Sequence, residues 1–190
     1  MYYSKVKGFI RLLVLVALIS MGAVQPNSAA TILDNPNGPE LPADCGSIAV
    51  GEGFKLIFHV YAKGVQIYRW TGTAWVLDAP RASLFAEDNY FGEVGNHYVG
   101  PTWESKSGSK IVGRRVTGTG CTPDSSAIAW LLLEKVSTSG SGIFSKVTFI
   151  QRVNTTGGLP PTTAGSSVGE IKEVPYTAEY YFYRKDSGQE

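Results

Sequence analysis

Hydrophobic side chains recur at every second position along much of this chain. In the clearest run, Phe54, Leu56, Phe58 and Val60 alternate with Lys55, Ile57, His59 and Tyr61. A period of two places alternate side chains on opposite faces of a β-strand, whereas an amphipathic helix requires a period of 3.6. We therefore expect this segment to be a strand whose four named residues face inward.

Similar short segments, separated by turns rich in glycine, continue to the end of the chain. Ala62-Lys63-Gly64 is expected to form a turn, Asp78-Ala79-Pro80 to end a strand, and Gly113 to mark a bulge. Residues 81–102 show no regular pattern. The expected strands are 54–61, 65–70, 74–77, 102–105, 110–112, 127–133, 143–153 and 176–183. Together they predict an all-β fold, an antiparallel sandwich or barrel with little helix, in a single domain over residues 45–184.

The segment 127–133, Ala-Ile-Ala-Trp-Leu-Leu-Leu, is apolar throughout. An antiparallel strand with one face in water would alternate, so a continuous apolar run indicates that both faces are covered. We expect Trp130 to Leu133 to form a central strand in which Leu132 is buried.

The first thirty residues have the three parts of a signal peptide. Lys5, Lys7 and Arg11 precede an apolar run over residues 12–24, and Ser28-Ala29-Ala30 supplies small residues for cleavage after Ala30. The run is shorter than the roughly 20 residues that span a bilayer, so no stable membrane anchor is expected after cleavage. The sequence thus predicts secretion, extracellular or periplasmic, with an irregular arm at 31–44 and a tail at 185–190.

The chain has two cysteines, Cys45 and Cys121, and both follow the leader. In an exported protein an isolated pair is most simply a disulfide. A zinc site is not expected, since there is no Cys-x-x-Cys pair and the chain has only two histidines, His59 and His97.

Charge and motifs narrow the function classes further. Lys and Arg number 17 against 16 Asp and Glu, and three of the basic residues lie in the leader, which disfavours a nucleic-acid partner. The chain contains no phosphate-binding or dinucleotide glycine motif, so no cofactor is expected. A Gly-x-Ser-x-Gly sequence at 165–169 stands in a loop rich in Pro, Gly and Ser, without the strand-to-helix turn of a nucleophile elbow.

The most suggestive candidate site is the segment 97–104. Around a Gly100-Pro101 bend it gathers His97, Tyr98, Trp103 and Glu104, an apolar platform with a few orienting polar groups, as small-molecule and carbohydrate sites have. Gln66 and Tyr68 are the expected cross-strand contributors. In the alternative, Trp103 belongs to the core and His97 forms a local hydrogen bond.

Two function classes follow from this segment. We favour a non-catalytic binding or structural module with a small-molecule or carbohydrate ligand. The alternative is a hydrolytic enzyme in which His97 and either Glu104 or Glu87 form an acid–base pair, although the chain offers no convincing nucleophile.

Several long segments resemble the family catalogued as domain of unknown function 3455. They are KLIFHVYAKGVQIYRW at 55–70, HYVGPTWES at 97–105, AIAWLLL at 127–133, IQRVNTTGGLPP at 150–161 and VPYTAEYYFY at 174–183. The resemblance covers about residues 41–184 and implies a small exported protein without an established activity. It carries over no catalytic residues. Relatives often have cysteines where this chain has Trp70 and in the loop at 161–164; the chain lacks both.

Overall fold

The computed structural model describes residue 1 and residues 38–187. Residues 2–30 of the predicted signal peptide, residues 31–37 of the predicted arm and residues 188–190 of the predicted tail lie outside the described residues. No helix in the described part of the chain is both long enough and apolar enough to cross a membrane.

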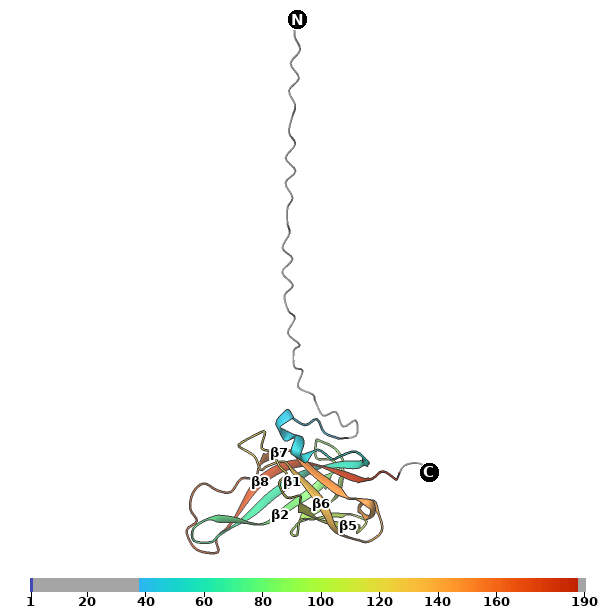
Figure 1. The fold of residues 1–190 in the computed structure, drawn as a ribbon. Coiled ribbons are helices and arrows are strands. Elements are labelled where there is room, and N and C mark those ends of the chain that lie inside the picture. Colours follow the sequence, from blue (N-terminus) through green and yellow to red (C-terminus); the bar gives the residue numbers. More distant parts are fainter. Residues whose placement is uncertain (2–37, 188–190) are drawn as a thin grey trace.

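The described chain forms a closed barrel of eight antiparallel strands (Figure 1). Each strand pairs with the next in sequence, and β8 pairs with β1 to close the sheet. Over residues 38–187, helix is limited to two 3₁₀ turns, η1 (Ala43–Ile48) and η2 (Ile143–Lys146). The all-β prediction is confirmed, and of its two alternatives the barrel is observed. The strands are β1 (Phe54–Trp70), β2 (Trp75–Phe85), β3 (Glu93–Tyr98), β4 (Thr102–Ser105), β5 (Lys110–Arg115), β6 (Leu131–Ser139), β7 (Phe149–Gly157) and β8 (Ile171–Lys185).

The predicted turn at Ala62-Lys63-Gly64 is wrong, because β1 continues through it as one long strand. Gly64 faces the barrel interior opposite Ala82 of β2, and a Cβ there would lie 2.1 Å from the carbonyl oxygen of Arg81. Glycine therefore permits close approach of two strands at this point rather than a reversal of the chain.

The predicted strand end at Asp78-Ala79-Pro80 is also wrong. β2 runs on to Phe85, with Pro80 opposite Gln66 and beside an irregularity in the pairing at Ile67/Tyr68. The region from 81 to 102 then contributes β3 as well as the end of β2. The sequence did not indicate β3, because Gly95 interrupts the alternation of side chains. In the structure this glycine permits close packing, since a Cβ there would lie 2.2 Å from the carbonyl oxygen of Glu104.

The strands predicted at 102–105 and 110–112 and the bulge predicted at Gly113 are confirmed. β4 and β5 are joined by the turn at 106–108, and the pairing of β5 with β6 shifts register between Val112 and Gly113. β6 begins at Leu131, so the strand predicted at 127–133 is observed only over its last three residues, and Trp130 forms an isolated bridge with Cys121. The strand predicted at 143–153 begins only at Phe149, because residues 143–146 form η2. Leu132 is buried on one face of this strand and Leu133 on the other, so both faces are covered as expected.

The buried residues form two clusters, one inside the barrel and one outside it. The inner cluster includes Val60 and has Phe58 packed against it, whereas Phe54 and Leu56 pack against the outer cluster. A bulge in the β1–β8 pairing between Leu56 and Phe58 exchanges the two faces. The inward prediction is therefore correct for Phe58 and Val60 and wrong for Phe54 and Leu56.

The outer cluster is covered by η1, which lies against the outside of the barrel near β7 in Figure 1. Gln151 of β7 donates a hydrogen bond from Nε2 to the carbonyl oxygen of Ile48, at 2.8 Å. The predicted disulfide joins Cys45 of η1 to Cys121, with Cα atoms 5.3 Å apart. A closed loop of 76 residues contributes roughly 4 kcal/mol on the chain-entropy model.

Candidate functional site

The barrel interior has two chemically different ends. One end is filled by aromatic side chains: Phe182 stacks on Phe58 with ring centroids 4.4 Å apart and lies 5.1 Å from Phe144, which η2 contributes to the inner cluster. A cavity of about 450 Å³ opens here, and its walls include Val60 and Leu84. This apolar end is built as a hydrophobic core.

The opposite end, which we call the polar end, is lined by side chains that carry hydrogen-bonding groups. It contains a cavity of about 390 Å³. Gln66 enters it from β1, His97 from β3, Trp103 from β4, Arg152 from β7 and Tyr180 from β8. The strand pairings place His97 opposite Trp103 and Arg152 opposite Tyr180. The five side chains therefore reach the cavity from two parts of the barrel, the β3–β4 pair and the β7–β8–β1 group.

His97 is held in a fixed orientation at the polar end. Its ring stacks on Trp103 at 4.4 Å between centroids, and its Nδ1 lies 2.9 Å from the carbonyl oxygen of Thr102. Burial lowers the pKa of His97 to about 3, so the ring is neutral at ordinary pH. A carbonyl oxygen can only accept, so Nδ1 carries the proton and Nε2 keeps a free lone pair.

Four buried polar atoms have no hydrogen-bond partner within the described residues: Gln66 Nε2, Trp103 Nε1, Tyr176 Oη and Tyr180 Oη. Three of them belong to residues that border the polar cavity. Their side chains are almost fully buried, with Gln66 2% exposed and Trp103 and Tyr180 each 1% exposed. Buried polar groups in native proteins are nearly always satisfied, so this concentration makes the polar end the strongest candidate for a functional site.

Arg152 brings a positive charge into the same end. Its Nε and Nη2 donate to the carbonyl oxygen of Ala129 at 3.1 and 2.7 Å. Burial raises the pKa of Tyr180, and the charge of Arg152 acts against that increase. Arg152 forms no ion pair with any carboxylate in the described part of the chain.

The structure divides the residues that the sequence placed together at 97–104. His97 and Trp103 point into the barrel, whereas Tyr98 and Glu104 point outward, because successive residues of a strand face opposite sides. Outside, Tyr98 donates a hydrogen bond to Glu104 at 2.8 Å, and Lys110 forms an ion pair with the same carboxylate at 3.2 Å. These contacts hold the pKa of Glu104 below its usual value.

The other sequence candidates also have definite places. Gln66 borders the polar cavity, while the hydroxyl of Tyr68 donates to the carbonyl oxygen of Gly158 at 2.7 Å. Glu87 is exposed in the connection between β2 and β3. No group of three His, Cys, Asp or Glu side chains within residues 38–187 is arranged to hold a metal ion.

Sequence reasoning missed Tyr180 and Arg152. The alternation that placed Phe182 inside the barrel also places Tyr180, two residues earlier, on the same face. In the same way Arg152 lies two residues after the buried Ile150. This period of two was the available signal, but tyrosine and arginine also occupy ordinary strand surfaces, so the alternation alone does not indicate a site.

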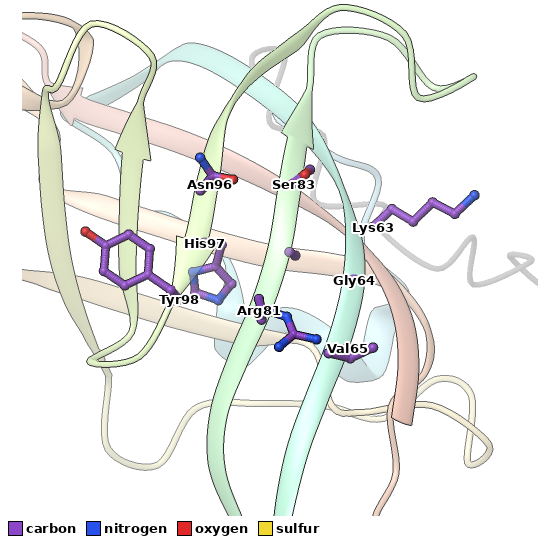
Figure 2. Close-up of a pocket in the computed structure, with 9 residues that line it drawn as sticks. Lys63, Gly64, Val65, Arg81, Ser83, Asn96, His97 and Tyr98 are labelled. Carbon is purple, nitrogen blue, oxygen red and sulfur yellow. The ribbon is translucent and has the colours of Figure 1, made fainter. Parts of the chain in front are cut away.

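A shallow hollow of about 550 Å³ lies beside β1, β2 and β3 (Figure 2). Its walls include Lys63, Arg81, Ser83 and Asn96. In Figure 2, Lys63 extends away from the hollow, and Tyr98 and His97 project in different directions from β3. Within the described residues, none of the four side chains that carry a buried, unpartnered polar atom lines this hollow. The hollow is therefore a weaker candidate than the polar end.

The family described as protein of unknown function (DUF3455) matches residues 51–184. The chain belongs to this family. The match confirms the resemblance seen in the sequence and includes all eight strands apart from the last residue of β8. No curated protein and no solved structure matches the chain.

Proposed function

We propose that this DUF3455 protein is an exported, non-catalytic binding protein that holds a small molecule at the polar end of its barrel. The leader pattern and the disulfide support export, since disulfides persist in oxidising compartments. N-terminal sequencing of the mature protein tests this step, with Thr31 as the expected first residue.

The observation that carries the binding proposal is the set of unpartnered polar atoms beside one cavity. A buried donor without a partner costs about 1–3 kcal/mol, and Gln66, Trp103 and Tyr180 each bring such an atom to the same place. Natural proteins retain local costs of this kind chiefly where function requires them. A bound ligand that pairs with these atoms would recover the cost.

The geometry favours binding over hydrolysis. The acid–base alternative requires His97 and a glutamate on one side of the sheet, but Glu104 lies on the outer face and is engaged by Tyr98 and Lys110. The cavity volume of about 390 Å³ also favours a small molecule over a long carbohydrate chain, which would need an extended groove.

The test is a thermal unfolding screen of the purified protein against metabolites and oligosaccharides. A ligand present at 100 times its dissociation constant stabilises the folded state by about 2.7 kcal/mol, which is readily detected. The double variant Gln66→Leu, Tyr180→Phe should lose the response, whereas Glu104→Gln, on the outer face, should keep it. A library without any stabilising compound, or hits that persist in the double variant, would contradict the proposal.

A further inference from the structure

The charges around the polar cavity are unbalanced. Arg152 and Arg115 both border it, and neither forms an ion pair within residues 38–187. Among the described residues, Asp78 is the only acidic one in the cavity wall, and it is already paired with Arg69. A half-buried cation without a counter-charge attracts anions more strongly than an exposed one, because less water screens it.

The hydrogen-bonding groups show the same bias. Gln66 Nε2 and Trp103 Nε1 can only donate, and the hydroxyl of Tyr180 can donate as well. Arg152 has five N–H groups, of which two are engaged by the carbonyl oxygen of Ala129. A cavity with this surplus of donors is complementary to a ligand group that only accepts.

The other residues that line the cavity indicate the shape and polarity of the rest of the ligand. Leu131 and Leu133 contribute apolar surface, and the stacked rings of His97 and Trp103 form a flat wall. Nε2 of His97 keeps a lone pair, so the cavity also offers one acceptor for a ligand hydroxyl.

From these features, and resting on the proposed function, we infer that the ligand is a small organic acid. Its carboxylate is held by Arg152 together with the unpartnered donors of Gln66, Trp103 and Tyr180. Its apolar body packs against Trp103 and the leucines. Arginine suits this role because its planar fork matches the two oxygens of a carboxylate.

The experiment compares acids with amides of nearly the same shape. Benzoate, 4-hydroxybenzoate and phenylacetate are titrated into ¹⁵N-labelled protein, each alongside its neutral primary amide. The readout is the indole N–H signal of Trp103, one of four tryptophans, assigned with the variant Trp103→Phe. We expect the acids to shift this signal and to bind at least tenfold more tightly than the amides.

Two variants locate the source of the preference. Arg152→Gln should reduce the ratio of acid to amide affinity to near one. Arg81→Gln removes an arginine that pairs with Glu173 on the exposed surface, and it should leave the ratio unchanged. The wild-type ratio decides the inference even if Arg152→Gln fails to fold.

The outcomes separate the two proposals. If the amides bind as tightly as the acids, or if the compounds recovered from the broad screen are neutral or cationic and shift Trp103, the organic-acid inference is wrong and the binding function stands. If neither the probes nor any compound of the screen shifts Trp103, both are wrong.

Discussion

The two ends of the barrel interior are similar in size and opposite in chemistry. The apolar end has a cavity of about 450 Å³ walled by Phe58, Leu84 and Phe144, and the polar end has one of about 390 Å³. Four buried polar atoms of the described residues have no partner, and they belong to Gln66, Trp103, Tyr176 and Tyr180. None of these four residues borders the apolar cavity.

This difference indicates a division of roles within one sheet. Aromatic packing at the apolar end maximises contact and leaves no polar atom in need of a partner, which is what stability requires. The polar end accepts unsatisfied donors and an unpaired charge, which stability alone would remove. Substitutions at the apolar end should therefore reduce mainly stability, whereas substitutions at the polar end should reduce mainly binding.

The largest effect is expected from Phe182→Ala at the apolar end. Phe182 is fully buried and packs on both Phe58 and Phe144. Loss of a buried phenylalanine side chain costs about 3–5 kcal/mol, because the lost burial is compounded by the cavity that remains. Urea unfolding followed by tryptophan fluorescence measures the free energy of unfolding.

Phe182→Leu is the matched control, since it keeps most of the volume and should cost clearly less. A loss below about 1 kcal/mol for Phe182→Ala would mean that the apolar end is not the stabilising half.

A smaller effect, dependent on pH, is expected from His97 at the polar end. Burial lowers its pKa to about 3 in the folded protein, whereas an unfolded histidine has a pKa of about 6.5. Between these values the unfolded state binds a proton that the folded state does not. Stability therefore falls as pH is lowered through this range, by up to about 1.4 kcal/mol per pH unit.

His97→Phe keeps a flat ring against Trp103 but cannot titrate, so this part of the pH dependence should disappear. Urea unfolding of both proteins at pH 4, 5, 6 and 7 measures the difference. Parallel profiles for the variant and the wild type would show that His97 is not buried in its neutral form.

Much of the fold could be predicted from the sequence because strand alternation is a local property. The period of two around Phe58 and Val60, the apolar run ending at Leu133 and the pair of cysteines each indicated a correct feature. The errors arose where a distant strand decided the local structure. Gly64 looks like a turn residue until Arg81 is known to lie against it.

The candidate site was harder to predict for the same reason. Nearness in sequence grouped His97 with Glu104, but the pleat of the hairpin separates them. The residues that do accompany His97 and Trp103 come from β1, β7 and β8, and only closure of the barrel brings them together. Gln66 was identified because it shares a face with Tyr68, whereas nothing local connects Arg152 to His97.

The smallest expected effect on stability is also the sharpest test of the comparison, because two buried tyrosines of β8, one in the inner cluster and one in the outer cluster, differ in their hydrogen bonding. Tyr183 donates a hydrogen bond to Gln151 Oε1 at 2.7 Å, whereas the hydroxyl of Tyr180 has no partner within the described residues. Tyr183→Phe leaves Gln151 Oε1 unsatisfied and should cost about 1–2 kcal/mol. Tyr180→Phe removes only an unpaired polar atom, so stability should stay unchanged or rise by up to about 1 kcal/mol, while binding at the polar end weakens.

Urea unfolding and ligand titration of both variants give the comparison. Equal losses of stability would mean that the Tyr180 hydroxyl is satisfied within the folded protein, and the polar end would then lose one of the atoms that mark it as a site.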